Sequence, residues 1–294
     1  MRVFVTGATG FVGSEVVRQL IAAGHEPTGL ARSEKSAAAL RAAGARVLQA
    51  DLSDIDRLTV GAGEADGVIH CGFIHDFNNF AVSVDVDKRA IEALAAGVGS
   101  DRPLIVTSGT AGLSLGRAST EDDAPNPNAY EGNPRVSEQT GLALGGNVMV
   151  MRLPPSVHGE GDHGFVPTLI NIARSKGVSG YVDAGANRWP AVHRTDAARA
   201  YVLALEKGQA GTRYHAVGEE GIAFRDIAEV IGRKLGLPVV SVAQAQAGEH
   251  FGWMGRFAGM DVPASSQLTQ TRLGWQATGP RLMEDLEAGS YFAA

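Results

Sequence analysis

The N-terminal stretch MRVFVTGATGFVG constrains the fold more than any other part of the chain. A short β-type run ending at Thr6 leads into three spaced glycines, and an amphipathic segment follows. This arrangement gives a tight turn and a close backbone approach, and the following helix N-terminus attracts a pyrophosphate. The motif therefore predicts a dinucleotide-binding βα unit. Its expected cofactor contacts are Thr6, Gly7, Thr9, Gly10, Phe11, Val12 and Gly13.

The first 150 residues alternate short apolar runs with amphipathic stretches. This order is typical of a parallel sheet wrapped by helices. The predicted strands are 2–6, 27–31, 46–50, 67–70, 103–108 and 147–152. The predicted helices are 11–23, 35–43, 54–60, 80–97 and 134–145. We therefore expect an α/β protein with a doubly wound parallel (Rossmann) sheet.

From Leu153 onward, the pattern changes to loops rich in proline and glycine, followed by further helices and short strands. The predicted helices are 165–176, 195–206, 223–236, 244–258 and 280–289, and the predicted strands are 191–193, 212–216 and 239–242. We expect residues 1–153 to form the dinucleotide-binding domain. Residues 154–294 would form mainly a smaller C-terminal substrate lobe, with elements that return to the Rossmann sheet.

Composition excludes several classes of partner. The chain has 294 residues and a net charge of −6, and no basic stripe runs along it, which argues against nucleic acid as the main partner. No apolar run reaches the length of a membrane span, and the first residues do not resemble a signal peptide. The single cysteine, Cys71, cannot form an intramolecular disulfide. We expect a cytoplasmic protein that acts on a small-molecule substrate.

The end of the second predicted strand bears on the choice of cofactor. Proteins of this fold that prefer NAD usually carry an acid about 20 residues beyond the glycines, where it binds the adenosine ribose. Here the chain reads Arg32-Ser33, and the first acid is Glu34. A guanidinium with a neighbouring hydroxyl suits a 2′-phosphate, so we expect NADP(H) rather than NAD(H). The alternative is that Arg32 is a solvated loop charge.

Several ordered segments resemble one family. They are TGATGFVG, the pair Asp51-Leu52, VIHCGF at 68–73, IVTSGT at 105–110, RLPPSVHG at 152–159 and WPAVHRTDAARA at 189–200. Together they are similar to the extended and atypical short-chain dehydrogenases/reductases, which include epimerase and dehydratase relatives. The resemblance covers nearly the whole chain.

The resemblance implies a set of site residues. Ser108 matches the family's serine or threonine that hydrogen-bonds the substrate carbonyl. The implied cofactor contacts are Asp51 and Leu52 beside the adenine, His70, Cys71 and Gly72 along the cofactor, and Pro154, Pro155, Ser156 and Val157 beside the nicotinamide.

The family's acid–base pair, Tyr-x-x-x-Lys, is missing. Alignment of its neighbourhood places Pro134 at the tyrosine and Glu138 at the lysine, and no lysine occurs between Lys88 and Lys176. A carboxylate cannot lower a phenol pKa as a lysine does. We assign Glu138 to the cofactor site, as an acceptor for ribose hydroxyls whose charge favours oxidised nicotinamide; the alternative is a residue on a solvent-facing helix surface. Asn133 and Pro134 predict a helix start.

Two residues are candidates for the missing proton donor. Tyr130 lies in NPNAYEGNP, which the prolines and the glycine predict to be a loop, and it is either a displaced acid or a lid residue. His158 falls where the family has a tyrosine near the nicotinamide, and a histidine suits a proton relay. The spacing of His158, Glu160, Asp162 and His163 resembles a metal site, but no second cluster supports it, and we expect no metal.

Three functions remain open. The first is an NADP(H)-dependent oxidoreductase acting on a small, largely apolar carbonyl or related group, with Ser108, Tyr130 and His158 as catalytic candidates. The second is an NADP(H)-binding sensor or scaffold without catalysis. The third is a nucleotide-sugar epimerase or dehydratase. The apolar segment HFGWMGRFAGM at 250–260 predicts either a cover over the pocket or the face of a homodimer.

Overall fold

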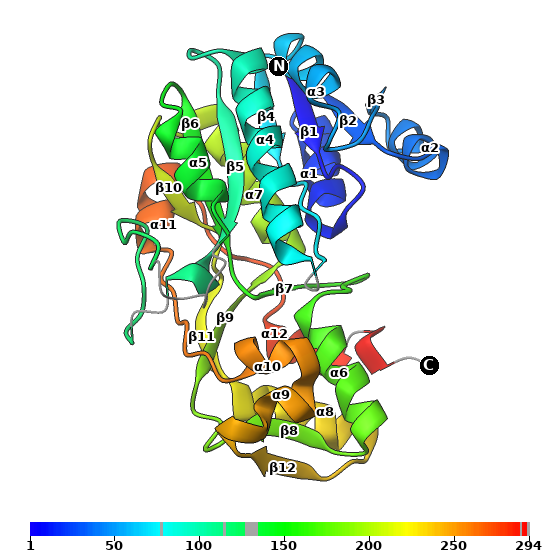
Figure 1. Ribbon diagram of the computed structural model, residues 1–294, viewed down its shortest axis with the longest axis vertical. Helices are drawn as coiled ribbons and strands as arrows, with labels where there is room; N and C mark the ends of the chain where they lie inside the picture. Colours follow the sequence, from blue (N-terminus) through cyan, green and yellow to red (C-terminus); the bar gives the residue numbers. More distant parts are fainter. Residues whose placement is uncertain (77–78, 114–115, 127–134, 289, 293–294) are drawn as a thin grey trace.

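A computed structural model describes residues 1–76, 79–113, 116–126, 135–288 and 290–292. Two parts follow one another along the long axis of the molecule in Figure 1, with strands β7, β9 and β11 between them. The larger part carries the N-terminus, and the smaller part contains α6, α8 and β12.

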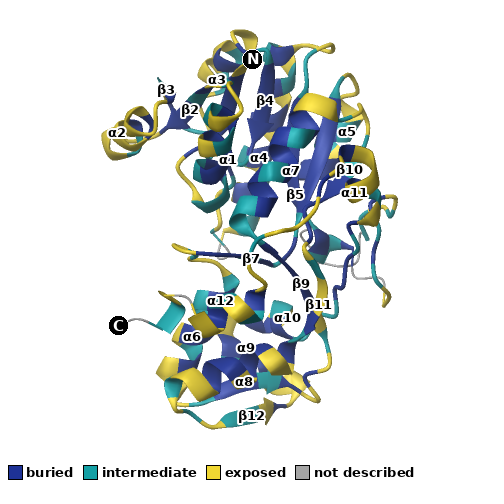
Figure 2. Ribbon diagram, turned by 180° about the vertical axis from the view of Figure 1, so that it is seen from behind, coloured by how far each residue is buried: buried dark blue, intermediate teal, exposed yellow. Residues whose placement is uncertain are grey.

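The larger part is built on a parallel sheet of seven strands in the order β10-β6-β5-β4-β1-β2-β3. The strands are β1 (Arg2–Thr6), β2 (Glu26–Ala31), β3 (Arg46–Gln49), β4 (Gly67–His70), β5 (Leu104–Gly109), β6 (Val148–Leu153) and β10 (Arg213–His215). This confirms the predicted doubly wound sheet. Because the sheet is covered on both faces, its central strands are mostly apolar and almost entirely buried (Figure 2).

Helices cover both faces of this sheet. Val3 and Val5 of β1 belong to the same apolar cluster as α1 (Phe11–Ala22) and α7 (Arg194–Lys207). The alternate residue Phe4 belongs to the opposite cluster, which contains α3 (Ile55–Gly63) and α4 (Phe80–Val98). α2 (Glu34–Ala42) packs at the β2–β3 edge, and α5 (Ser137–Ala143) packs on β5 and β6. Alternation along β1 thus explains the two layers.

The smaller part has its own core. A three-stranded sheet has the order β11 (Glu219–Ala223), β9 (Arg188–His193) and β7 (Ser156–His158), and β8 (Ser179–Val182) pairs with β12 (Val239–Val242). The cluster that joins these strands includes side chains of α6 (Phe165–Lys176), α8 (Phe224–Leu235) and α12 (Leu282–Ala288). β7, β8 and β11 were not predicted, because β7 has only three residues and β8 and β11 each contain a glycine.

The single helix predicted over 244–258 is wrong. The segment is broken into η2 (Gln244–Gln246), α9 (Ala247–Phe251), η3 (Gly252–Met254) and α10 (Gly255–Ala258). Gly252 has φ +59°, which ends α9 because a right-handed helix requires negative φ. α11 (Gln267–Leu273) was not predicted, and the short helices η1 (Thr110–Gly112) and η4 (Ser290–Phe292) complete the described elements.

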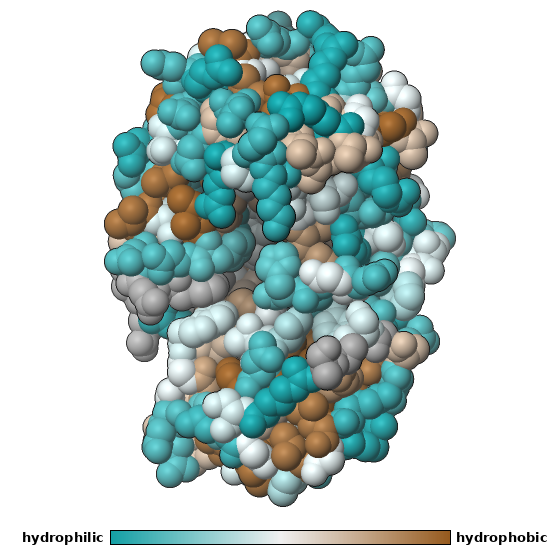
Figure 3. All heavy atoms as spheres, turned by 90° about the vertical axis from the view of Figure 1, so that its right-hand side faces the viewer, coloured by the Kyte–Doolittle hydropathy of each residue, from teal (hydrophilic) through white to brown (hydrophobic). Residues whose placement is uncertain are grey.

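Elements beyond residue 153 return to the large sheet. β10 pairs with β6, and Tyr201 of α7 and Trp275 belong to the core cluster beneath β1. The sequence boundary at 153 therefore does not coincide with a boundary between cores. No described helix is long and apolar enough to cross a membrane. The face in Figure 3 is largely hydrophilic, with separate apolar patches.

Candidate functional site

The glycine loop between β1 and α1 lies against the end of β4. A Cβ on Gly7, which has φ +64°, would come within 2.7 Å of the Gly72 nitrogen. A Cβ on Gly13 would lie 2.1 Å from the Gly7 carbonyl oxygen. Both positions therefore exclude any side chain, and the loop can keep its close packing only with glycine there.

The first turn of α1 fits a pyrophosphate. Gly10 is its N-cap and supplies no side-chain hydrogen bond, and the turn contains no acidic residue. The first N–H groups of a helix have no partner within the helix and carry a partial positive charge, so an external anion is favoured there. Thr9 and Gly10 are exposed, while Phe11 and Val12 are partly buried.

Arg194 is a neighbour of this loop that sequence analysis missed. Its guanidinium carbon lies 4.7 Å from the ring centroid of Phe11, and Nη2 donates to Ser14 Oγ at 3.1 Å. Nη1 donates to the carbonyl of Glu160 at 2.9 Å. Arg194 thus ties the loop after β7 to the beginning of α1. Arg194 and Ser14 are 180 positions apart in sequence, so no local pattern could place Arg194 beside this loop.

The end of β2 presents Arg32 to solvent. Arg32 is exposed and forms no ion pair or hydrogen bond with any described residue. Ser33 is the N-cap of α2, where its Oγ accepts from the Ser36 nitrogen at 3.2 Å and donates to Ser36 Oγ. Arg32 is therefore available for an anionic ligand, whereas the Ser33 hydroxyl already has local partners.

Asp51 and Leu52 follow β3 near the glycine loop. Asp51 Oδ1 accepts from the backbone and the hydroxyl of Ser53 at 3.0 and 2.9 Å. The Leu52 side chain lies 3.1 Å from the place where Gly72 would carry a Cβ. Leu52 thus packs against the end of β4, and its place beside the adenine remains a prediction.

His70 turns into the interior, which sequence analysis did not predict. Its ring is completely buried, with Nδ1 2.7 Å from Thr6 Oγ1 and Nε2 3.0 Å from Asp87 Oδ1. Thr6 Oγ1 also accepts from the Gly72 nitrogen at 3.2 Å. The side chains of Thr6 and His70 are both hydrogen-bonded inside the protein. They therefore support the ends of β1 and β4, and neither has a free side-chain group for a cofactor.

The buried network continues into α4 and α5. Ser137 Oγ donates to Asp87 Oδ2 at 2.5 Å. Burial by itself would raise the pKa of Asp87, but the hydrogen bonds from His70 and Ser137 and the charge of Arg135 hold that pKa below its usual value. Asp87 is therefore an ionised buried carboxylate. Burial raises the pKa of the adjacent Cys71 thiol to about 12, so this cysteine is unreactive at neutral pH.

Two hydroxyls lie at the carboxyl end of β5. Ser108 ends the buried part of the strand, and its hydroxyl forms no hydrogen bond with any described residue. Thr110 begins η1 and is completely buried, and its Oγ1 has no described partner. A buried hydroxyl is normally paired, so an ordered water or a ligand group is expected beside Thr110. Thr110 was missed because sequence analysis assigned the carbonyl contact to Ser108 alone.

Glu138 is neither available to a cofactor ribose nor placed on a solvent-facing helix surface, which were the two expectations. Its side chain is only 2% exposed, and its two oxygens accept from Arg152 Nη2 at 2.6 Å and Nε at 2.8 Å. Arg213 Nε also donates to it at 2.5 Å. Glu138 therefore faces β6 and β10 and has neither a solvent-facing carboxylate nor a free one for a ribose. The correction follows from the two arginines, which neutralise a carboxylate that could not be buried alone.

Comparison with known proteins supports a nucleotide-binding domain at the glycine loop. Residues 7–130 match a family model described as NAD(P)H-binding. An uncharacterised protein of Schizosaccharomyces pombe is 52% identical over 99% of this chain and 100% of its own length. A 4-hydroxy-2-methyl-3-oxo-4-farnesyl-3,4-dihydroquinoline-1-oxide ketoreductase of Stigmatella aurantiaca is 26% identical over 86% of this chain and 80% of its own.

A solved structure supports the same fold. The dTDP-glucose 4,6-dehydratase from Streptomyces venezuelae, with NAD bound, superposes with a TM-score of 0.78 at 22% identity, covering 99% of this chain and 97% of that chain. The chain belongs to the extended short-chain dehydrogenase/reductase family. It has that family's NAD(P)-binding α/β fold.

The structure describes only part of the region where the family carries Tyr-x-x-x-Lys. Tyr130, Asn133 and Pro134 lie outside the described residues, and α5 begins at Ser137. Arg135 was missed by sequence analysis. Its Nη2 donates to the Thr107 carbonyl at 3.0 Å and its Nε to Ser137 Oγ at 2.7 Å. The Arg135 guanidinium therefore lies beside Thr107, the residue before Ser108.

The segment after β6 places His158 deep in the smaller part. Its ring is completely buried, Nδ1 lies 2.8 Å from Asp285 Oδ2, and Nε2 has no described partner. Burial lowers the pKa of His158, and the hydrogen bond to Asp285 opposes this only in part. The imidazole is therefore neutral at pH 7. No direct hydrogen bond joins His158 to Ser108.

The other residues of this segment have mixed environments. Pro154 is buried and Pro155 is partly buried. Ser156 pairs with Ala191, and its buried Oγ has no described partner. Val157 packs against the core of the larger part. Leu153 pairs with Gly109, so the two prolines begin next to the end of β5; their contact with the nicotinamide remains a prediction.

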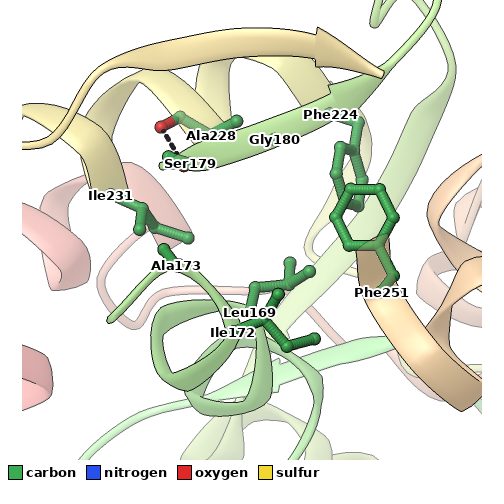
Figure 4. A pocket seen from close by; sticks show the side chains of 9 residues that line it. All are labelled: Leu169, Ile172, Ala173, Ser179, Gly180, Phe224, Ala228, Ile231 and Phe251. Carbon is green, nitrogen blue, oxygen red and sulfur yellow. Dashed lines mark hydrogen bonds between the residues drawn. The ribbon is translucent and has the colours of Figure 1, made fainter. Parts of the chain in front are cut away.

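A small apolar pocket in the smaller part has no catalytic groups. Figure 4 shows apolar side chains from α6, α8 and α9 around a cavity of about 10 Å³, with one polar interaction, from Ser179 Oγ to the Ala228 carbonyl. This cavity has room for about one water molecule and is lined by carbon, so it is a packing gap. Among the described residues, no group of three His, Cys, Asp or Glu side chains is arranged to hold a metal.

Proposed function

We propose that this protein is an NADP(H)-dependent oxidoreductase that reduces a small, largely apolar carbonyl compound. The observation that carries the proposal is Ser108, whose hydroxyl has no described partner at the carboxyl end of β5. In a parallel sheet, ligands bind outside the carboxyl ends of the strands. The likeness to the Stigmatella ketoreductase supports reduction of a ketone.

Aromatic side chains support an apolar substrate. Phe165 contacts Trp189, Trp253 and Phe257 with ring centroids 5.6, 5.7 and 5.1 Å apart. Trp253 is 42% exposed although it is large and apolar. An exposed aromatic beside a buried aromatic cluster suits an apolar ligand better than a diphosphate, which would require a cluster of basic residues.

The cofactor would be held by the glycine loop, with its 2′-phosphate on Arg32. NADPH supplies the hydride when bound. Ser108 would donate a hydrogen bond to the substrate oxygen, and Thr110 is a second hydroxyl at the same end of β5. The proton would come from Tyr130, His158 or water. The neutral state of His158 favours Tyr130 or water, because a neutral imidazole is a weak acid.

NADPH oxidation over a panel of ketones and aldehydes, followed at the nicotinamide absorbance, tests this function. We expect turnover by the wild type and a loss of about 100-fold in kcat/KM in Ser108→Ala, the usual scale for one hydrogen bond to a developing oxyanion. Ser100→Ala, at an exposed serine that bonds Asp101, is the matched control and should retain turnover. Unchanged turnover in both Ser108→Ala and Tyr130→Phe would refute the site.

Arg32 provides a test of cofactor choice. Arg32→Gln should weaken NADPH binding roughly tenfold or more, because one charge-assisted phosphate contact is lost, while NADH binding changes little. Arg41→Gln removes the same charge from the neighbouring helix, where Arg41 pairs with Glu34, and should leave both affinities intact. Equal effects of Arg32→Gln on NADPH and NADH would refute a 2′-phosphate contact. Calorimetric titration of the wild type and both variants with NADPH and with NADH measures these affinities.

Two other functions remain. An NADP(H)-binding sensor is favoured by the missing Tyr-x-x-x-Lys pair, and it predicts tight NADPH binding without turnover on any carbonyl. A nucleotide-sugar epimerase or dehydratase is favoured by the likeness to the Streptomyces dehydratase, and it predicts turnover of a sugar nucleotide without net consumption of cofactor.

A further inference from the structure

The guanidinium of Arg135 is fixed by three separate elements. Nη2 donates to the carbonyl of Thr107 in β5, and Nε donates to Ser137 Oγ in α5. The guanidinium carbon also lies 4.1 Å from the ring centroid of Phe73, which follows β4. Three fixed contacts give this cation one location, between the ends of β4 and β5. Nη1 has no described hydrogen-bond partner.

The direction of the cofactor places its nicotinamide half at this cation. β1 lies between β2 and β4, and β4 lies between β1 and β5. The pyrophosphate fits the helix that follows β1, and Arg32 at the end of β2 suits the adenosine phosphate. A dinucleotide that runs along this edge must extend its second half over β4 and β5, where Arg135 lies.

Among the described residues near Arg135, the guanidinium is nearer the surface than the carboxylates. Asp87 lies one hydrogen bond beyond Ser137 and is 2% exposed, so it is deeper than the guanidinium. Glu138 is neutralised by two arginines of its own. Arg135 is partly exposed, and a ligand at the edge therefore meets the cation before either carboxylate.

We propose that Arg135 makes the protein bind NADPH more tightly than NADP⁺. The two forms differ by one positive charge on the nicotinamide ring, and a fixed cation beside that ring disfavours the oxidised form. This inference rests on the proposed use of NADP(H) and on no particular substrate. It also reverses the expectation from Glu138, whose negative charge would have favoured NADP⁺.

Calorimetric titration of the full chain with NADPH and with NADP⁺ tests the proposal without any turnover. In Arg135→Gln, the ratio of Kd for NADP⁺ to Kd for NADPH should fall about tenfold, which corresponds to ~1.4 kcal/mol, or ~30 mV in the two-electron potential of the bound cofactor. Arg135→Lys keeps the charge and should keep the ratio within about threefold of wild type.

A matched control separates charge at the nicotinamide from general loss of binding. Arg32→Gln should weaken NADPH and NADP⁺ alike, because both carry the 2′-phosphate, and so leave their ratio unchanged. If Arg135→Gln does not fold, the double variant Arg135→Met with Asp87→Asn removes the cation together with the buried carboxylate and should lower the ratio to the same extent. An unchanged ratio of the two Kd values in a folded variant that lacks the Arg135 cation would overturn the inference, even if both affinities fell. Failure of wild type to bind either nucleotide would instead refute the proposed cofactor.

Discussion

Arg152→Met is expected to lower the free energy of unfolding by about 3–5 kcal/mol, the usual cost of breaking a buried ion pair on one side. Arg152 is fully buried, and its guanidinium donates to both oxygens of Glu138 and to the carbonyl of Asp123 at 2.7 Å. After substitution, Arg213, which is 26% exposed, is the one cationic partner that Glu138 keeps among the described residues, and the Asp123 carbonyl loses its Arg152 donor. Urea unfolding followed by circular dichroism measures the loss.

Two further variants distinguish an uncompensated charge from a loss of packing. Arg152→Met combined with Glu138→Leu removes the buried carboxylate as well and should recover at least half of the loss, because an apolar pair of similar volume is tolerated. Arg188→Met breaks an ion pair with Asp261 whose partners are 44% and 35% exposed, and it should cost less than about 1 kcal/mol. A loss below about 1 kcal/mol in Arg152→Met would show that Glu138 does not depend on this partner.

Gly13→Ala is expected to lower NADPH affinity by at least about 100-fold, or ~2.7 kcal/mol. The added methyl would lie 2.1 Å from the Gly7 oxygen and 2.8 Å from the Gly7 carbonyl carbon, both backbone atoms. Relief of this clash requires the loop to move away from the first turn of α1, which separates the groups that would receive the pyrophosphate. Titration by nicotinamide fluorescence, with a melting curve for each variant, measures affinity and folding separately.

Gly248→Ala is the matched control for this experiment. A Cβ at Gly248 has no neighbour within 4 Å, so the same chemical change introduces no clash. We expect its affinity and melting temperature to remain at the wild-type level or slightly above, since alanine favours the helix. If Gly13→Ala bound NADPH within about threefold of wild type, the glycine loop would not be the pyrophosphate site.

Local sequence patterns predicted the strand, the turn and the helix start of the NAD(P)-binding domain. β1 and the start of α1 were predicted to the residue, because strand propensity, glycine spacing and helix amphipathicity all occur within a dozen positions. The same holds for the accessible Arg32, which follows directly from the end of β2. Such features depend on neighbours in sequence, and local chemistry is sufficient to identify them.

Partners brought together by the fold were not predictable in this way. Glu138 and Arg213 are 75 positions apart, and β10 reaches its place beside β6 only after the chain has passed through the smaller part. The family resemblance singled out Glu138 but could not identify its partners. The same limit applies to His70, whose buried interactions come from β1 and α4.

The sequence by itself determined the parallel dinucleotide-binding sheet, the glycine loop and the absence of a lysine between Lys88 and Lys176. Only the tertiary structure decided which charges face the cofactor edge. It neutralised Glu138 inside the protein and held Arg135 between the ends of β4 and β5. The physical reason is that strand and turn preferences are local, whereas the field at a site is the sum of charges from distant segments and depends on which of them are buried and paired.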